Sequence, residues 1–340
     1  MRNSLRLNGS LVGLVVGLVF VLVVLGSQAW AQSPGKGITL RVASPPYLEE
    51  DFQKEVVLIG LEQMGYKVGP KIPLDGGPNF ILAVSQGDAD FFCNYWEPLH
   101  DPSYEKLGGG QKMLKVGVLI RECLQGLLID KKTADKHGIK TIGQFKDPNI
   151  AKLFDNNGDG KADLIGGSPG WGSTKTLDHQ LKVFGLEKTV THHQGTYFAM
   201  IADTIKRFES GNPVFYYSWT PMWINSIVVP GKDVVWLEMP GATEVDGKPI
   251  DTSVTGGRNF GYPANNVRVC ANMKFLDANP AAKRFIELVT IPLNDVSAQN
   301  LSMHKGEDKP ADVRRHAEQW VANHKAEFDG WVKEALKAAK

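Results

Sequence analysis

Cysteine is scarce in this 340-residue chain, which holds three of them, at positions 93, 123 and 270. A disulfide scaffold needs a dense and even set of cysteines, so the chain does not belong to the small disulfide-stabilised secreted proteins. At most one pair can form. We expect three buried thiols instead, because free cysteine behaves as a small apolar side chain.

An excess of charge of one sign is also missing. Lysine and arginine total 38, and aspartate and glutamate total 37. No basic surface for nucleic acid is therefore expected. The 42% share of hydrophobic residues excludes an intrinsically disordered chain.

Long apolar runs are missing except at the N-terminus. There, two basic residues (Arg2 and Arg6) precede the apolar stretch 11–25, and Ala29-Trp30-Ala31 follows it. This order is typical of an export signal, so we expect residues 1–31 to be removed and the mature chain to be periplasmic. The alternative is an uncleaved membrane anchor, whereas a lipid anchor is disfavoured because no cysteine follows the apolar stretch. The other hydrophobic stretches are too short or too interrupted to span a bilayer.

Recognisable catalytic motifs are missing too. The chain has no G-x-S-x-G nucleophile elbow, and His179, His192 and His193 have no partner at metal-ligand spacing. A secreted hydrolase that uses aspartate and histidine stays an alternative, but the pattern favours a protein that is not an enzyme.

What is present is an α/β pattern. A β-rich stretch at 38–43 precedes amphipathic helices at 49–64 and 79–86, each followed by a glycine. Such alternation predicts mainly parallel sheets flanked by helices. At this length we expect two domains. Stretches 116–120 and 124–129 carry the chain across to the second, and 267–271 returns it. The predicted lobes are therefore 37–125 plus 268–340, and 126–267.

Two similar aromatic stretches lie more than 100 residues apart, at 90–100 and 214–223. In each, a phenylalanine is followed four residues later by tryptophan and two later by proline. Because ligands of open α/β sheets bind beyond the carboxyl ends of the strands, two such strand ends predict two lobes that face one ligand.

Trp96, Trp171 and Trp219 each follow a predicted strand. Three indole faces that meet in a cleft form an aromatic box, which suits a quaternary ammonium group because that cation has no hydrogen to donate. The alternative is that the three rings are ordinary core residues.

The segment 167–173 runs from a strand into a helix. The backbone N–H groups of Gly172 and Ser173, with Ser173 as N-cap, would form an anion site there. The segment lacks the lysine of a P-loop, so a carboxylate is the expected anion. His100 would add an imidazole donor, although a structural role for this histidine is the alternative.

The loop 155–163 holds oxygen-bearing side chains at the spacing of the first half of a Ca²⁺-binding EF-hand loop. Position 12 of that pattern would be Gly166, where an EF-hand has glutamate. The alternatives are a structural Ca²⁺ and an Asx-rich turn without metal. The candidate metal-site residues are Asp155, Asn157, Asp159, Lys161 and Asp163.

Several longer motifs make the chain resemble the OpuAC-type family of periplasmic glycine betaine/L-proline-binding proteins of osmoregulatory ABC importers. The similarity runs through nearly the whole mature chain. It is dense at 87–91, at Trp96 with 98–101, and at 128–135, 151–164, 169–172, 178–181, 215–221 and 328–332.

The resemblance implies a two-lobed solute-binding fold of type II with the ligand in the cleft between the lobes. It implies a monomer that delivers glycine betaine, and possibly proline betaine or proline, to an ABC permease in the inner membrane, with no cofactor required. The family's three box tryptophans match Trp96, Trp171 and Trp219. Its carboxylate-binding groups match His100 and the backbone of Gly172 and Ser173, and its metal loop matches 155–163.

Some residues depart from the family pattern. Gly167 and Ser173 stand at positions where the resemblance implies cysteine in relatives, so a family disulfide is not expected here. Glu97 replaces a small polar residue beside Trp96, and Asn94 and Tyr95 also differ. Glu97 either faces solvent or favours a more cationic or carboxylate-free ligand. The alternative ligands are dimethylsulfoniopropionate, choline and trimethylamine N-oxide; a purely structural Ca²⁺-binding protein is a further alternative.

Overall fold

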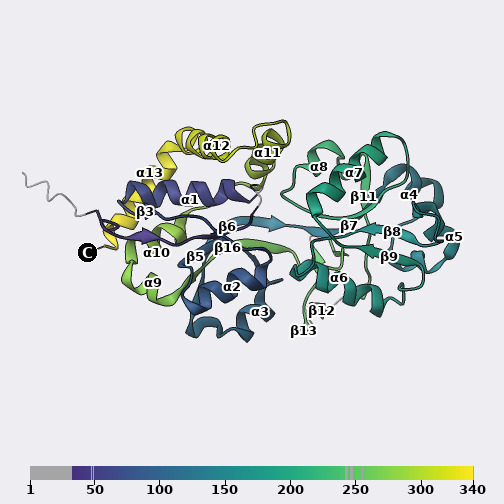
Figure 1. Ribbon diagram of the computed structural model, residues 1–340, viewed down its shortest axis with the longest axis horizontal. Helices are drawn as coiled ribbons and strands as arrows, with labels where there is room; N and C mark the ends of the chain where they lie inside the picture. Colours follow the sequence, from purple (N-terminus) through teal and green to yellow (C-terminus); the bar gives the residue numbers. More distant parts are fainter. Residues whose placement is uncertain are drawn as a thin grey trace, which may run out of the picture.

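The computed structural model describes residues 33–46, 48, 50–241, 244–245, 248–254 and 256–339. The predicted export signal at 1–31 lies outside this part of the chain. Figure 1 shows two α/β halves side by side along the long axis, joined by β6, β7 and β16. Within the described residues no helix has both the length and the apolar character needed to cross a bilayer.

The first half contains a three-stranded sheet in the order β5-β16-β6. Its strands are β5 (Phe91–Glu97), β6 (Met113–Cys123) and β16 (Asn265–Asn272), and the short strands β1 (Thr39–Leu40), β2 (Ala43–Ser44), β3 (Lys67–Val68) and β4 (Ile72–Pro73) pair beside it. The early helices of this half are α1 (Asp51–Gln63), α2 (Gly77–Gln86), α3 (Asp101–Lys106) and the 3₁₀ turn η1 (Gly109–Gln111).

The C-terminal helices return to the first half, where α11, α12 and α13 lie beside α1 (Figure 1). They are α9 (Met273–Ala278), α10 (Pro280–Leu288), α11 (Leu293–His304), α12 (Pro310–Asn323) and α13 (Lys325–Lys337). Gly60 of α1 explains one close contact, because a Cβ there would lie 2.0 Å from the ring of Phe285 on α10. The glycine inside this helix therefore serves packing.

The second half is built on a five-stranded sheet in the order β11-β7-β10-β8-β9. The strands are β7 (Gln125–Asp130), β8 (Ala162–Ile165), β9 (Val190–His193), β10 (Phe215–Trp219) and β11 (Val234–Trp236). The helices are α4 (Lys131–His137), α5 (Pro148–Ala151), α6 (Gly172–Val183), α7 (Tyr197–Glu209) and α8 (Ile224–Ile227), with 3₁₀ turns η2 (Ile142–Lys146) and η3 (Lys152–Phe154). Two hairpins follow, made of β12 (Glu244–Val245) with β13 (Lys248–Pro249) and β14 (Ser253–Val254) with β15 (Arg258–Asn259).

The expectation of mainly parallel sheets was wrong in strand direction. β16 pairs antiparallel with both β5 and β6, and the five-stranded sheet is mixed, with β7 antiparallel to β10 and β11. The reason is that the chain crosses between the halves twice. It leaves the first half through β6 and returns through β16, so these two neighbouring strands run in opposite directions. The stretch 142–154 is two 3₁₀ turns around one turn of α-helix.

Cys93, Cys123 and Cys270 are buried and unbonded, as expected. Burial raises the pKa of all three thiols above the ordinary value, because a thiolate is poorly solvated in an apolar interior. The thiols therefore contribute packing rather than reactivity.

Candidate functional site

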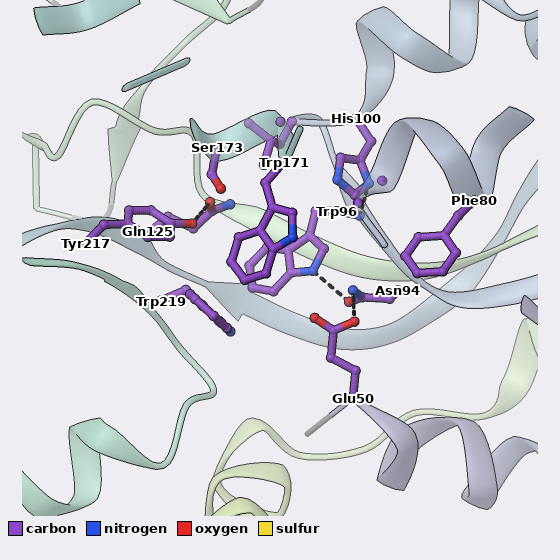
Figure 2. A pocket seen from close by; sticks show the side chains of 14 residues that line it. Glu50, Phe80, Asn94, Trp96, His100, Gln125, Trp171, Ser173, Tyr217 and Trp219 are labelled. Atoms are coloured by element: carbon purple, nitrogen blue, oxygen red, sulfur yellow. Dashed lines mark hydrogen bonds between the residues drawn. The ribbon is translucent and has the colours of Figure 1, made fainter. Parts of the chain in front are cut away.

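One cavity of about 460 Å³ lies where the two halves meet. All six residues predicted to bind ligand line it, and Figure 2 shows the side chains that converge there. They are Trp96, His100, Trp171, Gly172, Ser173 and Trp219.

The three tryptophans reach the cavity from different elements. Trp96 is near the end of β5 in the first half, whereas Trp219 ends β10 and Trp171 directly precedes α6 in the second. The rings of Trp171 and Trp219 meet edge to face, with centroids 5.7 Å apart. Trp96 and Trp219 are buried, so these indoles present their exposed parts to the cavity and not to bulk solvent.

Aromatic neighbours support the tryptophans in the second half. The ring of Tyr197 on α7 lies 4.8 Å from that of Trp219 and 5.6 Å from that of Trp171, measured between centroids. Tyr217, two residues before Trp219 on β10, also lines the cavity. Residues two apart in a strand project from the same face, which places both side chains on the cavity side.

The helix α6 begins at the cavity wall. Its N-cap is Trp171, so Gly172 and Ser173 are its first two helical residues, and the expectation that Ser173 is the N-cap was wrong. Gly170 has φ +90°, a left-handed conformation that turns the chain just before Trp171 and starts the helix early. The N–H groups of Gly172 and Ser173 belong to the first turn, where no intrahelical acceptor exists. They are donors for an anion in the cavity.

His100 is buried, and its Nδ1 accepts a hydrogen bond of 3.1 Å from the backbone N–H of Trp96. The proton of the neutral ring is therefore on Nε2, which makes that atom a donor. Burial lowers the pKa of His100 to about 4, so the ring is neutral near pH 7. A Cβ on Gly77 would lie 2.3 Å from Nε2, so glycine at that position leaves room for the imidazole.

The buried state of His100 predicts a pH-dependent stability. Its folded pKa of about 4 is below the ordinary value of 6.5, so the unfolded chain takes up a proton that the folded chain refuses. The contribution is full above pH 6.5 and is lost as the pH falls toward 4, by up to about 3 kcal/mol. We expect the free energy of unfolding in urea to fall less between pH 7 and pH 4.5 in His100→Gln than in the unmodified chain. Equal pH dependence in the two proteins would contradict this.

Eight further residues line the cavity, and none of them was predicted to bind ligand. They are Glu50, Gly76, Gly77, Phe80, Asn94, Leu99, Gln125 and Tyr217. Asn94 and Tyr217 lie two residues before the predicted tryptophans on their strands, which is a signal that strand alternation provides. Glu50 and Gln125 carry no such signal, because the fold alone brings them to the cavity.

Gln125 is the second buried donor near the helix start. Tyr217 donates a hydrogen bond of 2.6 Å to its Oε1, while its Nε2 has no partner within the described structure. An unsatisfied buried donor costs about 1–3 kcal/mol, which a ligand oxygen would recover. The Nε2 group therefore adds to the donors of Gly172, Ser173 and His100.

Glu97 fits neither alternative proposed for it. Its carboxylate forms ion pairs with Lys115, at 2.7 Å, and with Arg268. Burial raises the pKa of Glu97, but the hydrogen bonds and charges of Lys115 and Arg268 outweigh this and lower it. Glu97 thus connects the three strands of the β5-β16-β6 sheet through ion pairs. Its carboxylate is neither free in solvent nor one of the groups that line the ligand cavity.

The predicted metal loop is closed by hydrogen bonds within the protein. Asp155 accepts from the N–H groups of Gly158 (2.7 Å) and Gly160 (2.8 Å), and the Asn157 and Asp159 side chains accept from N–H groups two residues on. Asp163 accepts from the Asn156 N–H and contacts His193, and the Lys161 ammonium donates to the Glu187 carbonyl. In the described parts of the chain no three histidine, cysteine, aspartate or glutamate side chains are arranged to hold a metal ion.

The chain is similar in sequence to known periplasmic binding proteins. Residues 38–323 match a family described as the substrate binding domain of ABC-type glycine betaine transport systems, OpuAC. A glycine betaine/proline betaine-binding periplasmic protein of Salmonella typhimurium is 45% identical over 322 residues, which cover 94% of this chain and 97% of that protein.

Among solved structures, an ABC-transporter choline-binding protein in complex with choline has a TM-score of 0.70 at 15% identity, covering 88% of this chain and 96% of that one. The lactococcal OpuAC in its closed-liganded conformation with glycine betaine has a TM-score of 0.66 at 17% identity, covering 86% and 99%. These likenesses confirm the predicted solute-binding fold.

Proposed function

Because the chain belongs to the family of substrate-binding domains of ABC-type glycine betaine transport systems, we propose that it captures glycine betaine in the periplasm through its cavity of three indoles. Members of this family are binding components of transporters and not enzymes. The observation that carries the proposal is the meeting of Trp96, Trp171 and Trp219, from both halves, with a row of hydrogen-bond donors around one cavity.

The indoles bind the trimethylammonium head. A quaternary ammonium cannot donate a hydrogen bond, so its attraction to aromatic faces replaces the lost hydration. Each face contributes ~0.5–2 kcal/mol once water is excluded. Proline betaine carries the same type of charge and is the second expected ligand.

The donors bind the carboxylate. They are the N–H groups of Gly172 and Ser173, Nε2 of His100 and Nε2 of Gln125. Hydrogen bonds to a charged acceptor are worth about 1.5–3 kcal/mol each. Choline has no carboxylate, so it would leave these donors unsatisfied and bind more weakly.

Closure of the two lobes excludes water from the site. The proposed lobes are 37–125 with 268–340, and 126–267. Contacts between them include a hydrogen bond of 2.9 Å from the Trp171 Nε1 to Asp75 and the stacking of the Trp223 ring on His304, with centroids 4.0 Å apart. We propose that the closed monomer is the form that an inner-membrane ABC permease recognises.

Calorimetric titration of the mature chain with glycine betaine tests the proposal. We expect one site per chain and a raised thermal midpoint. A panel of proline betaine, dimethylsulfoniopropionate, choline and trimethylamine N-oxide ranks the alternatives. Absence of heat and of any thermal shift at millimolar glycine betaine would refute the proposed ligand, and tighter binding of choline would replace it.

For the loop 155–163 the contacts support the Asx-rich turn over a structural Ca²⁺. Desolvation raises the pKa of Asp155, but the N–H groups of Gly160 and Gly158 outweigh it and lower that pKa. These N–H groups thus stabilise the carboxylate in the way that a bound cation would. We expect neither millimolar Ca²⁺ nor a chelator to move the thermal midpoint or the betaine affinity. A rise in the midpoint with Ca²⁺ alone, absent with Mg²⁺, would restore the metal site.

A further inference from the structure

Glu50 brings a carboxylate to the cavity that holds the three tryptophans. It is the residue directly before α1 and is half-buried. Figure 2 shows its carboxylate beside Asn94 and below the indoles of Trp96 and Trp171, whereas Ser173 and His100 lie on the other side of these rings. The two ends of the cavity therefore differ in polarity, with a carboxylate at one end and hydrogen-bond donors at the other.

A chain of hydrogen bonds fixes this carboxylate. Asn94 donates from Nδ2 to Oε2 of Glu50, and its Oδ1 accepts from the indole Nε1 of Trp96 at 2.7 Å. Asn94 thus orients both the acid and the first box tryptophan. The carboxylate has limited freedom to turn away from the aromatic end of the cavity.

The negative charge of Glu50 acts on Tyr217, which lines the opposite wall of the cavity. Burial is the main cause that raises the pKa of Tyr217, hydrogen bonding with Ser173 opposes it, and the negative charge of Glu50 adds a smaller rise. Tyr217 belongs to β10 in the other half of the molecule. Since the field of Glu50 crosses the space between these walls, a ligand placed there experiences it.

We infer that Glu50 is a specificity-determining residue, which selects a positively charged head group and orients the zwitterion with its carboxylate toward α6. This rests on the proposed function. Indole faces contact a neutral tert-butyl group nearly as well as a trimethylammonium group by dispersion. An acid next to the box attracts the cation alone, and it repels the carboxylate of a ligand that enters in the reverse orientation.

The inference is tested with two ligands of one shape. Glycine betaine and 3,3-dimethylbutanoate differ in the atom that carries the three methyl groups, a charged nitrogen in the first and a neutral carbon in the second. The ratio of their dissociation constants measures selection for charge. For Glu50→Gln we expect the affinity for glycine betaine to fall about tenfold or more while that for 3,3-dimethylbutanoate holds or rises, so the ratio shrinks by at least the same factor.

Two further variants separate charge from positioning. Asn94→Leu keeps the acid and removes the hydrogen-bond chain, so both ligands should weaken by a similar factor with the ratio preserved. Glu50→Asp keeps the charge and should retain most of the ratio, and it serves as the informative variant if the glutamine protein does not fold.

The inference is overturned if Glu50→Gln weakens both ligands equally, since the residue would then act only by holding Asn94 and Trp96. It is also overturned if Glu50→Gln changes neither affinity, or if Glu50→Asp loses the ratio. Failure of the unmodified chain to bind glycine betaine at all is a different outcome, because it removes the proposed function itself.

Discussion

Replacing Trp219 with alanine is expected to weaken glycine betaine binding by about a hundredfold. The loss of one desolvated cation–π contact is worth about 2 kcal/mol, or roughly 30-fold, and the lost contact area of the indole adds to it. Trp219 is buried and touches Trp171, Tyr197 and Tyr217, so its removal also loosens the remaining wall.

Two variants control for this effect. Trp219→Phe keeps an aromatic face and should lose much less affinity than the alanine variant. Trp236→Ala removes a tryptophan of the same sheet, on β11, that packs on Phe260. Calorimetry should show its betaine affinity close to that of the unmodified chain. An unchanged affinity in Trp219→Ala, with folding intact by circular dichroism, would remove this residue from the box.

The second large effect is expected from Gly172→Pro, which deletes one N–H donor at the start of α6. Proline is tolerated at the first position of a helix, and Trp171 before it already has the extended conformation (φ −64°, ψ 145°) that a residue preceding proline prefers. The fold should therefore survive. Loss of one hydrogen bond to a carboxylate corresponds to about 10–100-fold weaker binding.

Gly172→Ala is the matched control, because it adds a methyl group but keeps the N–H. The nearest atoms to such a Cβ would be 3.8 Å away, on His100, so the space is adequate. The alanine variant should retain most of the glycine betaine affinity. If the proline and alanine variants bind equally well, the helix start does not hold the carboxylate.

The predicted ligand-binding residues that line the cavity share a feature. Trp96 and Trp219 are at the ends of strands that lead into turn-forming residues, and Trp171 and Gly172 follow a turn. Their position near a strand end was therefore readable from the local pattern. Their meeting in one cavity was an expectation that needed the tertiary structure. Their role in binding remains a prediction until the titrations above are made.

The residues that were missed, or given the wrong role, depend on partners distant in the sequence. Glu97 seemed important for the ligand because it adjoins Trp96, but strands alternate, and its side chain meets Lys115 on β6 and Arg268 on β16. Glu50 attracted no attention at a helix start, where an acid is ordinary. It matters because Asn94, 44 residues later, holds it in the cavity.

The sequence by itself determined the α/β elements, the apolar thiols and the family, since each follows from local periodicity, residue type or long matching segments. Tertiary structure decided the strand directions, the start of α6, the ion pairs of Glu97 and the polarity of the cavity. The physical reason is that hydrogen bonds and charges act between neighbours in space. Only the packing of the two halves against each other places the Glu50 carboxylate and the indoles of Trp171 and Trp219 on one cavity.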